Sequence, residues 1–249
     1  MLAKTQSSGE NGNALFLILI AVALFAALSY AVTQSGKSGG GGAGRELANL
    51  AASQVLQDFS AIEHAINKMM LLNGCTRYTL NFDHASWDVG NDYDNTGAPA
   101  NGSCDVFGEN GGGVTWTAPP PMVQSLASGS DSDTALATEY HVSYRIAIRG
   151  ITAGLVPTEQ LTLISRATRD MCIHVNNQSG ITNPSGEPPE VDSFFAYTAF
   201  TGTYPGAYDY GNPSGHGPEL AGHRTGCFLN TWSTDNGKYG IYHVLLAYD

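Results

Sequence analysis

The pattern of hydrophobic positions separates an apolar segment near the start of the chain from an amphipathic one that follows it. From Ala14 to Val32 no residue is charged, and only Ser29 and Tyr30 carry hydroxyl groups. A helix of this length, rising ~1.5 Å per residue, spans about 30 Å, which matches the core of a bilayer. The segment therefore predicts a cleaved secretory signal, a membrane anchor, or a helix that assembles with identical helices.

An amphipathic pattern begins after a glycine-rich linker at residues 36–44. Its apolar residues recur every three or four positions, as on one face of a helix, at Leu47, Ala51, Val55, Phe59, Ile62, Ile66 and Met69. Gly74 stands at the position of a C-terminal helix cap. We therefore expect a helix over residues 45–74 whose apolar face packs against a sheet.

Short apolar segments alternate with long polar loops over residues 75–249, which predicts a loop-rich β head domain. Glu139 to Ile151 alternates apolar and polar residues, as in a half-buried strand. Ser165 is expected to cap a short helix over residues 166–176. Further strands are expected at residues 78–82, 114–117 and 159–164, and a long loop at residues 177–222.

The C-terminal residues predict a β-hairpin that completes the sheet. Cys227–Trp232 and Tyr239–Ala247 are apolar and aromatic, and Asn236-Gly237 between them is a strong turn signal. The predicted fold class is α+β, with a long N-terminal helix (apolar, then amphipathic) and a C-terminal antiparallel β-sheet head. In chain order we expect a leader at 1–12, a transmembrane or assembly helix at 13–35, the linker at 36–44, the amphipathic helix at 45–74 and the head at 75–249.

The charge of the chain limits its partners. It has 11 basic and 22 acidic residues among 249, for a formal net charge of −11, and the basic residues form no cluster. Nucleic acid is not an expected partner, because phosphate binding needs clustered Lys and Arg. Few charged residues and abundant glycine suit a loop-rich extracytoplasmic domain.

The cysteines indicate an oxidising compartment. Cys75, Cys104, Cys172 and Cys227 form no CxxC pair, which makes a zinc ribbon a poor interpretation. An even number of cysteines beyond a membrane segment indicates two disulfides. Of the three pairings that four cysteines allow, we expect Cys75–Cys104 and Cys172–Cys227.

One acidic loop is similar to the first half of a calcium-binding loop. Asp92, Asp94 and Thr96 place oxygen atoms at alternate positions, and Gly97 follows for the tight turn. Ser103 stands where such a loop carries its bidentate Glu. Calcium is the one cofactor that the sequence suggests, and a solvated turn is the alternative interpretation.

The catalytic motifs HExxH and the P-loop are missing from the sequence, and GxSxG and GxGxxG occur only inside the glycine-rich linker at residues 36–44. His216, Glu219 and His223 share a loop, but their spacing fits no zinc pattern. Aromatic residues in the loops at 194–232 can stack on a sugar, or pack within the head and against neighbouring subunits: Tyr197, Tyr204, Tyr208, Tyr210 and Trp232.

The order of these segments resembles that of type IV pilins and type II secretion pseudopilins of Gram-negative bacteria. The similarity rests on a short leader ending in Gly12, an apolar helix from Asn13, an amphipathic extension and a C-terminal sheet. Gly226-Cys227 before the final hairpin and the segment 242–247 are also similar to pilin-like proteins. The resemblance implies that a prepilin peptidase cuts between Gly12 and Asn13.

Three features differ from the usual pilin pattern. Leu17 occupies the fifth mature position, where pilins usually carry a Glu that neutralises a neighbour's N-terminal amine. Glu10 lies in a leader that is usually basic, and the glycine-rich linker interrupts what is often one continuous helix.

The resemblance implies a non-enzymatic subunit, anchored in the membrane before it joins a filament or pseudopilus. Its partners would be the membrane, the prepilin peptidase and other pilin-like subunits, in a homo- or hetero-oligomer. It would reside in the bacterial inner membrane with its head in the periplasm, or in a cell-surface filament. The alternative is a membrane-tethered extracytoplasmic enzyme or sugar-binding module.

Overall fold

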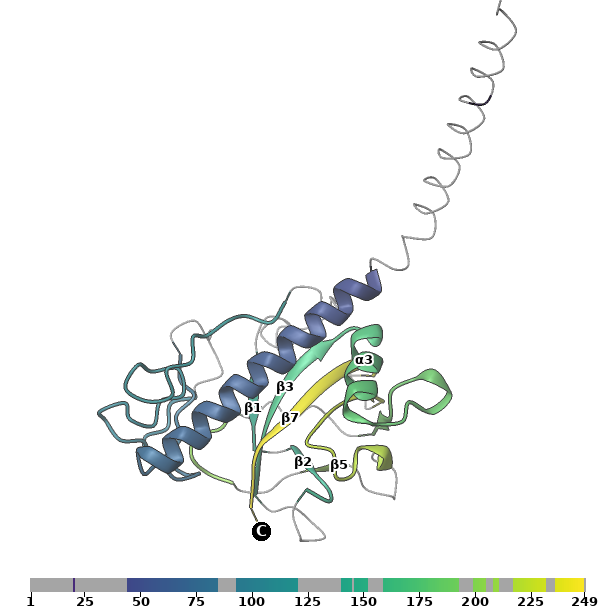
Figure 1. Cartoon of the computed structure of the whole chain (residues 1–249). Coiled ribbons are helices and arrows are strands. Elements are labelled where there is room, and N and C mark those ends of the chain that lie inside the picture. The colour runs from purple at the N-terminus through teal and green to yellow at the C-terminus, as the bar shows by residue number, and fades with distance from the viewer. Residues whose placement is uncertain are drawn as a thin grey trace, which may run out of the picture. The chain divides into compact units, whose positions relative to one another are not determined.

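The chain divides into two compact units, Met1–Glu46 and Leu47–Asp249, and the second contains most of the residues described below (Figure 1). The computed structural model describes residues 20, 44–84, 93–120, 140–144, 146–151, 159–192, 199–204, 208–210, 217–231 and 236–248. In those residues no helix has both the length and the apolar character needed to cross a membrane. The predicted leader and the predicted apolar helix at 13–35 lie outside them, apart from Ile20.

Residues 44–72 form a long helix, close to the predicted 45–74. Gly74, with a φ of 69°, adopts the left-handed conformation of a C-terminal cap. The Cys75 N–H donates back to the Met69 carbonyl at 3.3 Å, which closes the last turn. The predicted end of the helix is therefore confirmed.

The buried face of the long helix matches the predicted pattern except at its first turn. Followed back from Phe59 in steps of four and three, the buried stripe passes through Val55, Ala52 and Ala48. Leu47, which was expected on this face, is 48% exposed instead. The reason is that a stripe repeating every 3.5 residues reaches position 48 rather than 47 at this end.

The head contains a five-stranded sheet in the order β1-β3-β7-β6-β4. The strands are β1 (His141–Ser143), β3 (Glu159–Ala167), β4 (Glu190–Val191), β6 (Thr225–Asn230) and β7 (Lys238–Tyr248). All neighbours pair antiparallel except β4, which pairs parallel with β6. The predicted antiparallel sheet is thus wrong at this edge, because the connection over residues 192–224 is long enough to bring the chain back in the same direction.

The segment 139–151 was expected to form one strand, and it forms two that belong to different sheets. The chain bends at Tyr144, and β2 (Ile146–Ile148) leaves β1 to pair parallel with β5 (Tyr208–Tyr210). All three β1 residues are buried, so the strand is covered on both faces. The alternating pattern therefore did not mark a half-exposed strand.

Helix α3 (Arg169–Ser179) starts later than the predicted residue 166. Ser165, the expected cap, pairs with Ile241 inside the ladder of β3 and β7. Thr168 caps α3 instead, accepting the Met171 N–H at 3.4 Å. The predicted strand at 159–164 is confirmed but three residues longer, because its partner β7 continues past that point.

The predicted C-terminal hairpin is confirmed. Asn230 of β6 faces Lys238 of β7, and the Gly237 N–H donates to the Asn230 carbonyl at 2.8 Å. Gly237 has a φ of 82°, which glycine adopts without strain.

The strands predicted at 78–82 and 114–117 are wrong. In the first region the structure has a single bridge, between Asn81 and Asp105, and residues 114–117 are not part of a strand. Turns and side-chain hydrogen bonds organise this region instead. The predicted loop at 177–222 also contains β4, β5 and the short 3-10 helices η2 (Pro184–Gly186) and η3 (Pro218–Leu220).

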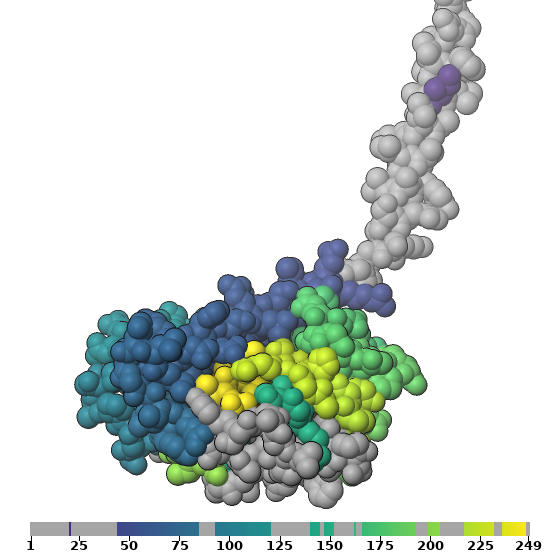
Figure 2. All heavy atoms as spheres, turned by 60° about the horizontal axis from the view of Figure 1, so that its bottom comes forward, coloured from purple at the N-terminus to yellow at the C-terminus, as the bar shows by residue number. Residues whose placement is uncertain are grey.

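The long helix and α3 cover one face of the five-stranded sheet (Figure 1). Ile241 of β7 belongs to the larger core with Phe59, whereas the next residue, Tyr242, belongs to a second core with Phe228. Successive β7 side chains thus enter two cores, as the pleat of a strand requires. Figure 2 shows the residues that follow the long helix, 75–84 and 93–120, at one end of that helix, and the α3 segment at its other end.

Candidate functional site

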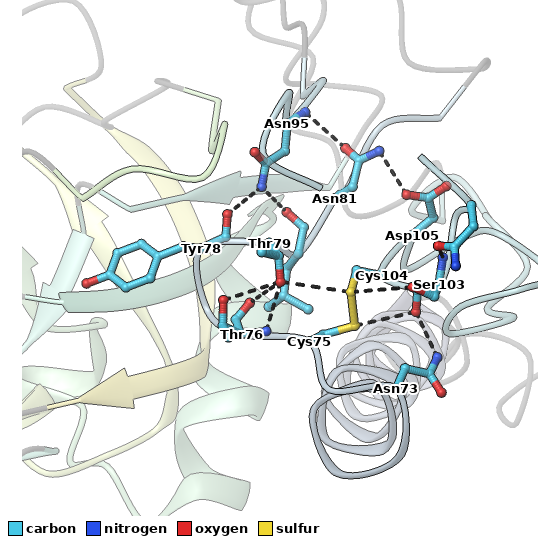
Figure 3. Close-up of a disulfide and its surroundings, with 12 residues drawn as sticks. Asn73, Cys75, Thr76, Tyr78, Thr79, Asn81, Asn95, Ser103, Cys104 and Asp105 are labelled. Atoms are coloured by element: carbon cyan, nitrogen blue, oxygen red, sulfur yellow. Dashed lines mark hydrogen bonds between the residues drawn. A yellow bond between two sulfur atoms is a disulfide. The ribbon is translucent and has the colours of Figure 1, made fainter. Parts of the chain in front are cut away.

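The two predicted disulfides are both present. Cys75–Cys104 joins the end of the long helix to the following loop, with the Cα atoms 5.7 Å apart (Figure 3). Beside it, the Asn73 side chain donates to the Ser103 carbonyl at 2.7 Å. Cys172–Cys227 joins α3 to β6. The predicted pairing is confirmed, and each bridge fastens a helix to a more distant part of the chain.

Asn95 organises the acidic loop in which the sequence suggests a calcium site. Its side-chain amide donates to the Tyr78 carbonyl (Figure 3) and to the Leu80 carbonyl, both at 2.8 Å. Its Oδ1 accepts the Gly97 N–H at 2.9 Å. Asn95 is buried, and a neutral amide therefore holds the centre of this turn.

The proposed calcium ligands are only partly described. Asp94 and Thr96 are exposed, whereas Asp92 lies outside the described residues. Within the described ranges, no three His, Cys, Asp or Glu side chains form a group that could hold a metal ion. The calcium loop therefore stays a prediction.

A polar network connects the long helix to the C-terminal hairpin. His243 of β7 lies 3.0 Å from Glu63 Oε2 through Nε2 and 2.7 Å from Thr225 Oγ1 through Nδ1. Arg224 donates to Glu63 Oε1 at 2.9 Å and to the Val244 carbonyl at 2.8 Å. The network spans three elements, so it fixes the helix over the last two strands.

Burial dominates the protonation of this histidine. Desolvation lowers the pKa of His243, and the nearby Glu63 carboxylate opposes that effect without overcoming it. A neutral imidazole has one N–H, which donates to Glu63, while Nδ1 accepts the Thr225 hydroxyl proton. A hydroxyl, an imidazole and a carboxylate thus form a continuous hydrogen-bonded series. Thr225 and His243 are also directly opposed across the β6–β7 ladder, so their contact is an ordinary cross-strand pair.

A cavity of about 320 Å³ lies between the long helix and the loop that contains Trp116. Its lining from the helix includes Asp58 and Ile62; Phe107 and Trp116 come from the loop, and Tyr140 precedes β1. The volume is at the lower end of the range for small-molecule sites. The cavity therefore suits a small ligand.

Three aromatic rings and one carboxylate give the cavity its chemistry. The Trp116 ring meets Phe107 and Tyr140 edge to face, each with an interplanar angle of 84°. The Tyr140 hydroxyl donates to Asp58 Oδ2 at 2.6 Å, and burial together with this carboxylate raises the pKa of Tyr140. Gln54 donates to the other oxygen of Asp58 at 2.9 Å.

Sequence reasoning did not identify this cavity. Asp58 and Tyr140 are 82 positions apart, and folding alone brings them together. The available signals were Trp116, which stands among small residues, and an acidic residue beside the apolar stripe of the helix. Neither of these residues indicates, from its place in the sequence, that it lies near the other in the fold.

Of the aromatic loop residues expected either to stack on a sugar or to pack within the head, only Tyr204 has a described side chain. Tyr204 packs against Tyr78 and Phe200, with ring centroids 5.7 and 5.1 Å away. Tyr197 and Trp232, and the side chains of Tyr208 and Tyr210, lie outside the described residues.

The remaining predicted site residues are also dispersed or outside the described ranges. In the histidine loop, His223 Nδ1 lies 3.0 Å from the Ser179 carbonyl, and His216 is outside the described residues. Gly12 and Asn13, the predicted processing site, are outside them too. Comparison of the chain with protein-family models, curated proteins and solved structures gives no match.

Proposed function

We propose that this chain is a pilin-like subunit of a bacterial filament or pseudopilus, held in the membrane by its apolar segment before assembly. The observation that carries the proposal is the order of segments: 19 residues without charge, from Ala14 to Val32, precede a long helix that packs on a sheet closed by the C-terminal hairpin. The proposal assigns no reaction to the head.

Physical chemistry supports a role in both the membrane and a filament. An uncharged helix surrounded by aliphatic side chains is stable in lipid, and it can bury the same surface against identical helices. Each Å² of apolar area removed from water contributes ~25 cal/mol. The same segment can therefore serve first as an anchor and then as an assembly element.

The construction of the head agrees with an extracytoplasmic position. Both disulfides are formed, which is typical of an oxidising compartment. They attach the end of the long helix and the start of the C-terminal hairpin, so that the loops between the strands are held at two places. A head exposed on a filament outside the cell would need such covalent support.

Mass spectrometry of the mature N-terminus tests the proposal. The full chain is expressed in a Gram-negative host with and without a prepilin peptidase, and the intact mass is measured from isolated membranes. We expect a chain that begins at Asn13 only when the peptidase is present. Gly12→Leu should prevent the cut, whereas Gly9→Leu, in the same leader, should leave it unchanged.

Other N-termini would contradict the proposal in distinct ways. A chain that keeps Met1 in the presence of the peptidase would be a simple signal-anchored protein. A start beyond Val32 would mean a secreted domain without an assembly helix. Where processing is seen, electron microscopy of sheared cell-surface fractions tests for filaments.

A further inference from the structure

Asp58 carries a negative charge beside an aromatic cavity and has only neutral partners in the described part of the chain. Its two carboxylate oxygens accept one hydrogen bond each, from Gln54 and Tyr140. The described residues that line the cavity include no Lys, Arg or His. Asp58 is half-buried, so a ligand cation in the cavity could pair with a charge that no described lining residue neutralises.

Three aromatic rings line the cavity together with this carboxylate. Trp116 is nearly perpendicular to both Phe107 and Tyr140, with ring centroids 5.3 and 5.9 Å away, so the three rings form one packed aromatic group in the lining. The Tyr140 ring also packs against Phe59, whose ring centroid lies 5.4 Å away. Aromatic faces are electron-rich and attract cations, and rings set at an angle to each other surround quaternary ammonium groups in known cages.

We infer that the cavity between Asp58 and Trp116 binds a small organic ammonium ion, with the carboxylate supplying the countercharge and the rings contacting the alkyl groups. The described lining offers no positive charge and the chain is strongly acidic, and both features favour a cationic ligand over an anionic one. The volume of about 320 Å³ limits the ligand to a small molecule. The inference does not depend on filament assembly, since every described lining residue lies in the unit Leu47–Asp249.

Choline and its neutral carbon isostere, 3,3-dimethyl-1-butanol, form a matched pair of probes that separates charge from shape. The full chain is kept in a polyoxyethylene detergent, which carries neither sugar nor choline, and binding is measured by titration calorimetry. We expect saturable binding of choline and binding at least ~10-fold weaker, or about 1.4 kcal/mol, for the isostere. Equal affinities would mean an apolar cavity that does not recognise charge, and would overturn the inference.

Two substitutions that each remove one negative charge test the role of the carboxylate. Asp58→Asn keeps the size of the side chain and removes the charge, and we expect choline binding to fall at least ~10-fold. Asp170→Asn removes an exposed carboxylate on α3, outside the cavity, and should leave choline binding unchanged. Equal effects of the two variants would indicate general attraction to an acidic protein.

The comparison of ligands on the unmodified chain keeps the test decisive if Asp58→Asn does not fold. Glucose and galactose serve as a further arm, because aromatic rings and a carboxylate also occur in sugar sites. Binding of a sugar without choline, or the absence of saturable choline binding, would overturn the inference. Neither result would bear on the N-terminal processing that tests the proposed function.

Discussion

His243 on the last strand donates its Nε2–H to Glu63 on the long helix, with 3.0 Å between nitrogen and oxygen. The two residues are 180 positions apart, so the contact connects the long helix to the last strand. The His243 ring also stacks on Phe59, with centroids 5.7 Å apart. A titratable side chain thus stands inside the main contact between helix and sheet.

Acidification is expected to weaken the head through His243. Burial lowers the pKa of His243, whereas in the unfolded chain it returns to ~6.5. Below that pH the unfolded state binds the proton more readily than the folded state, so the free energy of unfolding falls as the pH falls through this window. The groups facing the ring are Glu63, Arg224 and Thr225.

Urea unfolding of the unmodified chain and of His243→Gln measures this effect. Glutamine does not titrate, so the variant should lose less stability between about pH 7.5 and 5.5, the interval around the unfolded pKa of histidine. The same loss in both proteins would show that other groups control the pH dependence.

The two disulfides should contribute unequally to stability. Cys172–Cys227 closes a separation of 55 residues, and Cys75–Cys104 one of 29. Loss of either native bridge typically costs about 2–5 kcal/mol, and the chain-entropy relation makes the longer loop worth about 0.6 kcal/mol more. Denaturant unfolding of the two double Cys→Ala variants checks the order. A larger loss for the pair 75 and 104 would mean that local packing, rather than loop length, decides the difference.

Gly226 is expected to be intolerant of a side chain. A Cβ atom there would lie 2.5 Å from Ile181 Cδ1 and 2.7 Å from the Tyr242 hydroxyl oxygen, and both of those residues are buried. Overpacking of this kind costs roughly 1–3 kcal/mol, so Gly226→Ala should lower the midpoint of thermal unfolding. Gly44→Ala is the control, because a Cβ at that helical residue meets nothing within 4 Å. An unchanged midpoint for Gly226→Ala would show that the second core can relax around the methyl group.

Membrane retention should depend on the apolar segment and not on exposed leucines of the long helix. Ile20→Asp places a charge in the predicted span, and a charge at the centre of a span costs about 2.5–3.5 kcal/mol. We expect the variant to leave the membrane fraction during alkaline carbonate extraction. Leu71→Asp, at a position 82% exposed near the end of the long helix, should not change the distribution. Retention of Ile20→Asp would contradict the anchor.

Local signals predicted the elements whose residues lie close together in the sequence. The long helix, its glycine cap and the C-terminal hairpin each depend on a repeat or a turn within a few residues, and all three are present. Position 165 shows the limit of such signals. Ser165 is a good helix cap by type, but the ladder opposite Ile241 extends β3 beyond it.

The candidate cavity could not be predicted in this way. Asp58, Trp116 and Tyr140 come from a helix, a loop and the approach to a strand, and none has a neighbour in the sequence that indicates a binding site. Likewise, the alternating residues around Tyr144 gave no sign that β1 and β2 enter different sheets. Such contacts join segments that are far apart in the sequence, and a local hydrophobic pattern does not predict them.

The sequence by itself determined the apolar segment, the amphipathic helix, the α+β class and the cysteines available for two bridges, because each follows from local pattern or composition. The tertiary structure alone decided the parallel edge strand β4, the contact of His243 with Glu63 and the charged aromatic cavity at Asp58. The physical reason is that burial and pairing of these groups arise from packing between segments far apart in the chain.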